Sequence, residues 1–383
     1  MKNTLDQEIS IDIEYPEYIK EMTAYIAGRP IDEVAREFNL EPKNIIKLAS
    51  NENPYGMSDL AKQAILNYLS QENKSETARY PDASQFNLRT AVAQKFNIPA
   101  NTITFGNGSN DILELAARTL VNPRTESIMY DEYSFAVYAL TTKAMGAEAQ
   151  VIKSTPDYGH DLKQMLANIK ANTKLIFIAN PNNPTGTFIP AMELQHFIEN
   201  VPKNVIIVLD EAYNEYLDNK LQYNSLDWLK QHDNLIVCRT FSKAYGLAAL
   251  RVGYCASSVK ITDYLNRIRQ PFNVNSLALI AAEHSLNDIE FLNKTCISNK
   301  YGYAQIISGL EKIGINYIPS YGNFIMMHTH KFSGNELNKK LLARGIIIRP
   351  LGSYGLDNYV RVSIGLPCEN ERFLEVMQEI FVA

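Results

Sequence analysis

The chain has 383 residues, of which 46% are hydrophobic and 21% are charged, and its formal net charge at pH 7 is −5. This composition is ordinary for a globular protein of about two domains, and it disfavours a disordered, collagen-like or coiled-coil chain. The mild acidity gives no electrostatic reason to expect nucleic acid or an anionic membrane as the main partner.

The N-terminal segment 1–20 carries acidic side chains where a signal peptide would have an apolar core, and no window approaches the roughly 20 apolar residues of a membrane span. We therefore expect a cytoplasmic protein without a membrane segment. The cysteines form no CxxC pair and have no histidine at ligand spacing, so we expect free thiols and no metal site.

In chain order, residues 1–45 are polar and irregular and predict an N-terminal arm rather than a domain. The segments 58–70 and 84–96 place apolar residues three and four positions apart, which is the spacing of amphipathic helices. The sequence ARYPD at 78–82 predicts a loop between them.

Short apolar, β-branched runs bounded by turn residues follow, and they alternate with helical stretches. Runs of this kind predict an α/β domain with a mostly parallel seven-stranded sheet that helices cover on both faces. We expect this large domain to span 46–275, and the change of pattern after 275 predicts a smaller α+β domain over 276–383. The predicted strands are 103–105, 127–130, 149–153, 174–180, 204–210, 234–238 and 252–256.

The residues that follow these strands are unusually polar, and open parallel sheets bind their ligands at the carboxyl ends of the strands. After the first run comes GNGSNDIL, in which Ser109 and Asn110 open a helix. Such a turn presents backbone N–H groups and the positive end of the helix dipole to an anion, most naturally a phosphate. A plain capped turn is the alternative interpretation.

Three more strand ends carry candidate functional residues. Asn183, in PNNPTG, precedes a proline, so its peptide bond is a candidate for the cis form. Asp210 ends a wholly apolar run, where it is desolvated unless a cation lies opposite; capping the next helix is the alternative. Thr240, Ser242 and Lys243 follow the run NLIVC. A desolvated lysine with a near-neutral pKa suits Schiff-base chemistry, although a lone loop lysine is more often on the surface.

Together, NPNNPTG (180–186), DEAYNEY (210–216) and SKAYGLAALRVGY (242–254) resemble the fold type I pyridoxal-phosphate (PLP) aminotransferases over nearly the whole chain. Within that superfamily, the chain is similar to the class II histidinol-phosphate aminotransferases. The segments that carry this second resemblance are KLASNENPYG (47–56), ARYPD, GNGSNDIL (106–113) and RPLGSYGLDNYVRVSIGLP (349–367).

The resemblance implies pyridoxal 5′-phosphate as the cofactor and assigns catalytic roles to three residues. Lys243 would form the aldimine with PLP, and Asp210 would pair with the pyridinium nitrogen so that the ring absorbs electrons. Tyr213, together with Asn183, would reach the phenolic oxygen of the ring.

The resemblance also implies the remaining cofactor contacts. Tyr133 would stack on the ring face, although the family usually has Pro-Thr or a similar pair before this aromatic residue and this chain has Asp131-Glu132. A phosphate contact from a neighbouring subunit would make the protein a homodimer with shared active sites, and segment 1–45 would take part in the dimer contact. The phosphate ligands implied are Ser109, Asn110, Thr240, Ser242, Arg251 and, from the neighbouring subunit, Tyr80.

Substrate recognition falls to three residues that match the family pattern. Arg361 would grip the α-carboxylate of glutamate or the substrate phosphate bidentately, and Arg349 would face the phosphate or the distal carboxylate. Tyr25 would be lent by the arm of the partner subunit. For each arginine, a surface ion pair is the alternative interpretation.

The predicted reaction converts L-histidinol phosphate and 2-oxoglutarate to imidazole-acetol phosphate and L-glutamate, a step of histidine biosynthesis, with ping-pong kinetics. An aromatic amino-acid aminotransferase is the nearest alternative on this scaffold, and a PLP-dependent phospho-amino-acid decarboxylase is a third. A PLP-binding transcriptional regulator would need a helix-turn-helix module for which the short arm leaves no room. An NAD-dependent dehydrogenase is disfavoured because no GxGxxG follows a strand.

Overall fold

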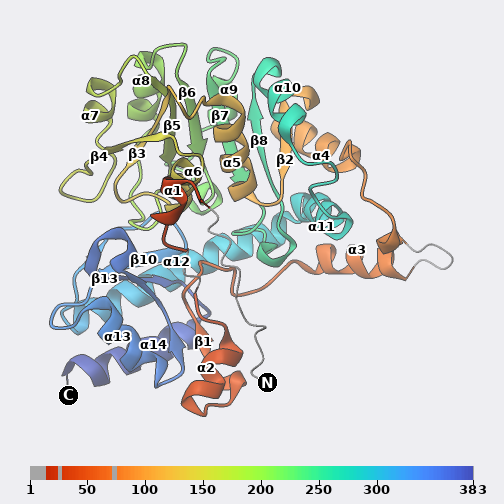
Figure 1. Ribbon diagram of the computed structural model, residues 1–383. Coiled ribbons are helices and arrows are strands. Elements are labelled where there is room, and N and C mark those ends of the chain that lie inside the picture. The colour runs from red at the N-terminus through yellow and green to blue at the C-terminus, as the bar shows by residue number, and fades with distance from the viewer. Residues whose placement is uncertain (1–13, 25–27, 71–75, 383) are drawn as a thin grey trace, which may run out of the picture.

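The computed structural model of the chain describes residues 14–24, 28–70 and 76–382. All the strands predicted for the large domain are present: β2 (Ile103–Gly106), β3 (Ser127–Asp131), β4 (Glu148–Ile152), β5 (Thr173–Ala179), β6 (Ile206–Asp210), β7 (Leu235–Thr240) and β8 (Gly253–Ser257). They form one seven-stranded sheet in the order β2-β8-β7-β6-β5-β3-β4 (Figure 1). Strand β8 is antiparallel to both neighbours, and the other adjacent pairs are parallel. The predicted α/β class with a mostly parallel sheet is therefore confirmed.

Helices cover both faces of this sheet. One face packs against α5 (Ser109–Leu120), α6 (Ala136–Ala144) and α10 (Val259–Ile268), and the other against α7 (Leu162–Ala167), α8 (Ala191–Asn200) and α9 (Ser225–Trp228). Because successive strand residues point to opposite faces, Val208 of β6 enters the first core while Ile207 and Leu209 enter the second. The continuous apolar strands of the sequence therefore reflect burial on both faces.

The same alternation decides where the carboxylates at the end of β6 point. Asp210 is two residues after Val208 and therefore faces α6, where the Tyr138 hydroxyl donates a hydrogen bond to it. Glu211 faces the opposite side and forms a buried ion pair with Arg239, with 2.9 Å between Arg239 Nη2 and Glu211 Oε2. The side chains of Asp210 and Glu211 therefore point to opposite faces of the sheet.

A second, smaller sheet is antiparallel and has the order β12-β13-β10-β9. Its strands are β9 (Tyr317–Ile318), β10 (Phe324–His328), β12 (Arg349–Leu351) and β13 (Leu356–Ser363). The helices α12 (Ile289–Lys312), α13 (Gly334–Leu342) and α14 (Pro367–Val382) supply side chains to a core on this sheet. Figure 1 shows this unit below the large sheet.

The N-terminal part of the chain returns to the small unit. Helix α2 (Ile31–Phe38) shares a buried cluster with Leu342 and Ile347, and strand β1 (Ile46–Lys47) pairs in parallel with β11 (Ile346–Ile347). The short helix α1 (Glu17–Lys20) lies against α6, where Lys143 Nζ donates a hydrogen bond to the Glu21 carbonyl oxygen at 2.8 Å.

The packing of α11 (Ser276–Asn287) bears on the boundary between the two units. This helix packs against α3 (Asp59–Leu69) and α4 (Phe86–Phe96), and its Ala278 and Ala281 are buried in one core with Leu88 and Ile103 of the large unit. Helix α12 starts after Asp288 and packs on α14. We therefore propose that the boundary lies at Asp288 rather than after residue 275.

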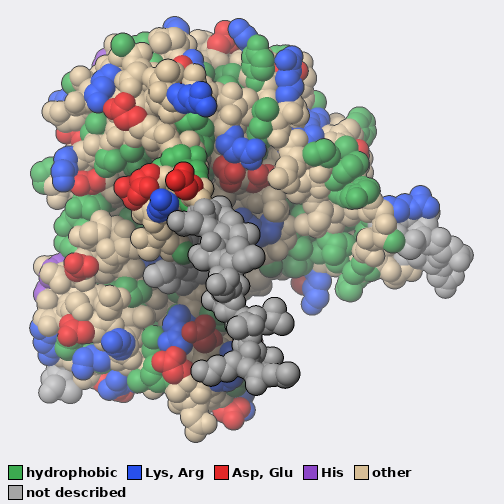
Figure 2. Space-filling view, in the orientation of Figure 1, with side chains coloured by type: hydrophobic (Ala, Val, Ile, Leu, Met, Phe, Trp, Pro, Cys, Tyr) green, Lys and Arg blue, Asp and Glu red, His purple; other side chains and the backbone are tan. Residues whose placement is uncertain are grey.

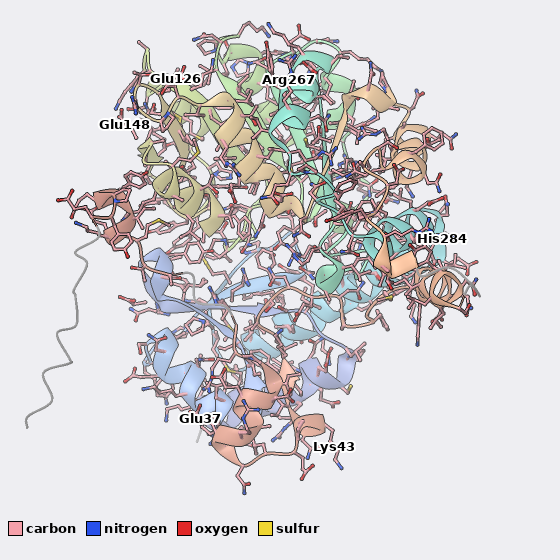
Figure 3. The ribbon with its side chains drawn as sticks, turned by 45° about the vertical axis from the view of Figure 1, so that its right-hand side comes forward. Glu37, Lys43, Glu126, Glu148, Arg267 and His284 are labelled. Carbon is pink, nitrogen blue, oxygen red and sulfur yellow. The ribbon has the colours of Figure 1, made fainter. Side chains whose placement is uncertain are left out.

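The surface carries charges of both signs. Figure 2 shows acidic and basic side chains interspersed over the face in view, and Figure 3 shows Glu126, Glu148 and Arg267 at the periphery of the large unit. Among the helices of the described ranges, none combines the length and the apolar run needed to cross a bilayer.

Candidate active site

A pocket at the carboxyl ends of β5, β6 and β7 brings most of the predicted site residues together. Its walls also include residues of the small unit, so the site lies where the two sheets meet. This is the position that open α/β sheets use for ligands. The predicted residues that line the pocket are Ser109, Asn110, Asn183, Asp210, Tyr213, Thr240, Ser242, Lys243, Arg251, Arg349 and Arg361.

One end of the pocket is built to receive an anion. Strand β2 turns into α5 at Gly108, whose φ of 86° is left-handed, and α5 begins at Ser109. A Cβ on Gly108 would collide with the Arg251 guanidinium, so only glycine permits this approach. Arg251 Nη1 in turn lies 3.4 Å from Ser242 Oγ and 3.0 Å from the Ala248 carbonyl oxygen, to which it donates. The helix N-terminus and the guanidinium together are suited to an anion.

Lys243, the predicted nucleophile, lines the pocket. Burial lowers its pKa to about 7, and the positive charges of Arg361 and Arg251 act in the same direction. Its Nζ donates a hydrogen bond to the Ser50 carbonyl oxygen at 3.0 Å. A substantial fraction of this amine is therefore neutral, and thus nucleophilic, near pH 7.

Asp210 is a buried carboxylate, so its ionised form is unfavourable unless a cation lies nearby. Burial raises its pKa to about 6, while hydrogen bonds from the Tyr138 hydroxyl and the Ala212 N–H partly offset this. The distances are 3.0 Å from Tyr138 Oη to Oδ2 and 3.2 Å from Ala212 N to Oδ1. A protonated heteroaromatic nitrogen in the pocket would stabilise the ionised form.

Tyr213 keeps its proton at all ordinary pH values. Its side chain is buried, and burial raises its pKa to about 12. Asn51 Nδ2 donates a hydrogen bond to the Tyr213 hydroxyl at 2.9 Å. Nearby, the Asn183 side-chain oxygen accepts a hydrogen bond from Arg361 Nη1, and the peptide bond between Asn183 and the next proline is cis.

Two arginines from the small sheet complete the pocket. Arg349 of β12 lies directly opposite Arg361 of β13 in the antiparallel register, so both side chains are on one face of the sheet. Arg361 is buried and donates through Nη2 to the Ala49 carbonyl oxygen at 2.9 Å. Like charges opposite one another on one face are unfavourable, and an anionic ligand between them relieves the repulsion.

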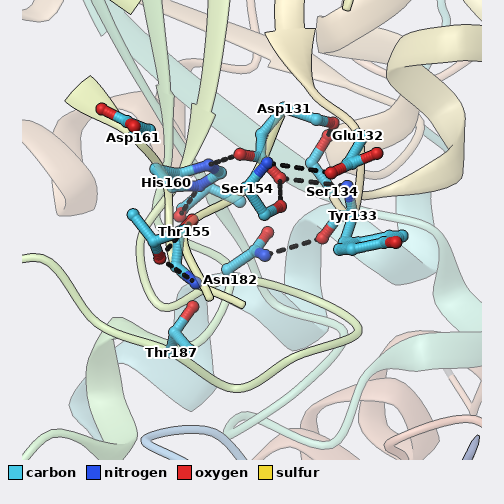
Figure 4. A network of polar contacts seen from close by, with 12 residues as sticks. Asp131, Glu132, Tyr133, Ser134, Ser154, Thr155, His160, Asp161, Asn182 and Thr187 are labelled. Atoms are coloured by element: carbon cyan, nitrogen blue, oxygen red, sulfur yellow. Dashed lines mark hydrogen bonds and ion pairs between the residues drawn. The ribbon is translucent and has the colours of Figure 1, made fainter. Parts of the chain in front are cut away.

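Tyr133 does not line this pocket, whereas Phe135 does. The backbone N–H of Tyr133 is held by Asp131 Oδ1 at 3.0 Å, and its carbonyl oxygen accepts from Asn182 Nδ2 at 2.8 Å (Figure 4). Fixed in this way, the Tyr133 ring packs against Tyr158, with 5.7 Å between the ring centroids.

Phe135 is a second candidate for the ring contact. It precedes the first residue of α6, and its ring meets Tyr138 edge to face at a centroid distance of 5.9 Å. Because Phe135 lines the pocket, we propose it as an aromatic ring contact beside the predicted Tyr133.

Two further residues, Tyr80 and Tyr25, were predicted from the family resemblance. The Tyr80 side chain is 81% exposed and stacks on Phe272, with ring centroids 4.6 Å apart, outside the pocket of its own chain. Tyr25 lies outside the described residues. In the described ranges, no three His, Cys, Asp or Glu side chains are placed to hold a metal ion.

Several lining residues were not predicted individually. The segment from Ala49 to Asn51 contacts three site residues: the Ala49 and Ser50 carbonyl oxygens accept from Arg361 and Lys243, and the Asn51 side chain donates to Tyr213. The run KLASNENPYG that contains this segment was recognised as a family pattern, and its consecutive small and amide residues were the available signal. Tyr354, from the short helix before β13, also lines the pocket, and no spacing pattern singles it out.

Comparisons with known proteins agree with this geometry. The family model "Aminotransferase class I and II" matches residues 43–377. The histidinol-phosphate aminotransferase 1 of Cupriavidus pinatubonensis is 51% identical over 95% of this chain and 95% of its own length. Among solved structures, the histidinol-phosphate aminotransferase of Sinorhizobium meliloti in complex with pyridoxal-5′-phosphate has a TM-score of 0.86 at 23% identity and covers 97% of this chain and 99% of its own. The L-threonine-O-3-phosphate decarboxylase of Porphyromonas gingivalis has a TM-score of 0.77 at 22% identity and covers 88% and 100%. The chain belongs to the class I and II aminotransferase family.

Proposed function

We propose that the protein is a PLP-dependent histidinol-phosphate aminotransferase that works in histidine biosynthesis. The observation that carries this proposal is the position of Lys243, a buried amine with a near-neutral pKa in a pocket that also holds Asp210 and the arginine pair Arg349 and Arg361. The similarity to the relative from Cupriavidus pinatubonensis supports the choice of histidinol phosphate within the family.

The pocket fits PLP at each of the cofactor's polar groups. The phosphate suits the anion site at the start of α5 with Arg251, and the protonated pyridine nitrogen suits the buried Asp210 carboxylate. Tyr213 and Asn183 supply polar groups for the phenolic oxygen, and the Phe135 ring supplies an aromatic wall. When bound, PLP supplies an aldehyde that condenses with amines and a ring that withdraws electrons from the bonds at the substrate Cα.

The residues of the chain then act on the substrate proton. With PLP and an amino substrate bound, the neutral Lys243 amine would be the base that takes the proton from the substrate Cα and the acid that returns it to the cofactor side. Ionised Asp210 would hold the protonated pyridine nitrogen. The burial of these groups excludes water and strengthens their electrostatic interactions.

The arginine pair explains how one site accepts two kinds of anion. Histidinol phosphate carries a phosphate and an amine but no carboxylate, whereas glutamate carries two carboxylates. Planar guanidinium groups bind phosphate and carboxylate with the same two-point geometry. The 2-oxoglutarate acceptor has the same two carboxylates as glutamate, so Arg361 and Arg349 provide a common site for the amino donor and the acceptor that alternate in a ping-pong reaction.

We further propose a homodimer in the cytoplasm with shared active sites. The exposed Tyr80 ring supports the dimer, because a phosphate ligand that lies outside its own pocket is available to the pocket of a partner. The four cysteines are unpaired, which suits a reducing compartment.

The test is a comparison of kcat/KM for histidinol phosphate and phenylalanine with 2-oxoglutarate as acceptor. We expect a clear preference for histidinol phosphate, and a preference for phenylalanine would identify an aromatic amino-acid aminotransferase instead. Release of CO2 from a phosphorylated amino acid would identify a decarboxylase. Lys243→Ala should abolish both the visible absorption of the bound cofactor and the reaction, whereas the exposed Lys230→Ala should change neither.

A further inference from the structure

Asn51 is a buried polar residue that links the small sheet to Tyr213. Its side chain is 1% exposed and its φ of 55° is in the left-handed region, which asparagine tolerates better than most residues. The Asn51 backbone N–H donates to Ser363 Oγ at 2.8 Å, and the Asn323 side chain donates to its carbonyl oxygen at 3.0 Å. Three segments of the chain therefore hold this residue in one position.

The hydrogen bonds around Asn51 run in one direction in the structure. The Asn51 backbone N–H donates to Ser363 Oγ, and the Ser363 hydroxyl donates to Asn51 Oδ1 at 3.1 Å. With its oxygen engaged by Ser363, the Asn51 amide presents its NH2 group to the Tyr213 hydroxyl at 2.9 Å. Tyr213 thus accepts a hydrogen bond on this side.

Because Tyr213 accepts a hydrogen bond from Asn51, its own hydroxyl hydrogen points away from Asn51. A phenol has one hydrogen, and Asn51 cannot accept it through an NH2 group. The hydrogen is therefore turned away from Asn51 and can be donated to a ligand in the pocket. The raised pKa of Tyr213 keeps that hydrogen in place.

We propose that Ser363 and Asn51 are positioning residues that force Tyr213 to donate its hydrogen bond into the active site. This inference rests on the proposed function, in which the acceptor is the phenolic oxygen of PLP. A hydrogen bond donated by Tyr213 would stabilise the negative charge on that oxygen. It would thereby lower the pH at which the nitrogen that links Lys243 to the cofactor loses its proton. Ser363 lies two residues after Arg361, so the same strand that binds substrate also orients the tyrosine.

Two substitutions test the direction of this relay in the cofactor-bound protein. Asn51→Asp replaces the donor by an acceptor of the same shape, and Ser363→Ala removes the group that orients the amide. The readout is a pH titration of the visible absorption of the bound cofactor. We expect Asn51→Asp to raise the transition by about one to two pH units, the equivalent of one hydrogen bond to a charged group, and Ser363→Ala to raise it by less. Ser285→Ala, which removes another buried hydroxyl, should leave it unchanged.

A double-mutant cycle separates orientation from charge. The carboxylate introduced by Asn51→Asp also raises the pH of the absorption transition by its negative charge alone. That charge effect persists in a Tyr213→Phe background. The effect of hydroxyl orientation does not, because phenylalanine has no hydroxyl. We expect a clearly smaller shift in the Tyr213→Phe background, and no shift from Ser363→Ala there. Equal shifts in both backgrounds would overturn the proposal.

A second readout does not depend on the cofactor. In a neutron diffraction map of the cofactor-free protein in D2O, we expect deuterons on the Asn51 atom that faces Tyr213 and the Tyr213 deuteron turned away from Asn51. A Tyr213 deuteron directed at Asn51 would overturn the relay. Failure of the unsubstituted protein to bind PLP would count against the proposed function, and the neutron map would still decide the relay.

Discussion

Lys243 Nζ donates a hydrogen bond to the carbonyl oxygen of Ser50 at 3.0 Å, although its burial favours the neutral amine. A carbonyl oxygen is an uncharged acceptor, so this contact holds the amine in place without the strong preference for the charged form that a carboxylate would impose. The lysine is therefore fixed in position and still easy to deprotonate.

The pKa of Lys243 predicts how cofactor uptake depends on pH. Only the neutral amine attacks an aldehyde, and burial lowers the pKa from 10.5 to about 7. The rate at which cofactor-free protein binds PLP covalently should rise about tenfold per pH unit below 7 and level off above it. Stopped-flow absorbance at saturating PLP measures this rate, with free lysine as the control. A rate that keeps rising to pH 10 would contradict the lowered pKa.

Substitutions at Phe135 and Tyr133 separate the two candidates for the ring contact. Phe135→Leu removes an aromatic wall of the pocket and should raise the Kd for PLP about three- to tenfold, which is the range expected for one aromatic pair. Tyr133→Leu, in the same turn, should change the Kd less than twofold. Fluorescence titration of cofactor-free protein gives both values, and the reverse order would identify Tyr133 as the stacking residue.

Hybrid dimers test whether Tyr80 serves the partner's site. We expect Lys243→Ala and Tyr80→Ala proteins each to have little activity alone. If Tyr80 acts across the interface, a mixed dimer contains one intact site, so unfolding and refolding an equal mixture should restore roughly a quarter of the unsubstituted activity through random pairing. No gain over the separate variants would place Tyr80 in its own chain's site or outside catalysis.

Arg361→Lys should lower kcat/KM for both histidinol phosphate and glutamate by about a hundredfold, because lysine keeps the charge but loses the two-point contact and the bonds to Asn183 and Ala49. Steady-state kinetics with each donor measures the loss. Arg267→Lys, at an exposed ion pair, is the matched control. A loss confined to one donor would show that Arg361 binds only that substrate.

The large sheet and most of the pocket could be predicted because their signals are local. Each strand is a short apolar run between turn residues, and parallel strands bring residues such as Asp210 and Lys243 to the same edge. The packing of α11 on the large unit, which underlies the proposed boundary at Asp288, could not be read in this way, since α11 is apolar and its partner helices lie about 200 residues earlier.

The choice between Tyr133 and Phe135 also depends on distant contacts. The loop that carries both is held by Asn182, which comes from another strand end. Local pattern shows that an aromatic residue is present but not which ring the loop turns inward. For the same reason Asn51 was not singled out, because its role depends on Ser363, 312 residues away.

The parallel pairing of β1 with β11 has a consequence for synthesis of the protein on the ribosome. Ile46 pairs with Ile346, so almost the entire chain must be translated before the partner strand of β1 exists. The segment 49–51, which contacts Lys243, Tyr213 and Arg361, follows shortly after β1. Contacts of such sequence separation form late in folding. A nascent chain can therefore build the large sheet early, but the pairing that anchors segment 49–51 forms only after β11 has left the exit tunnel.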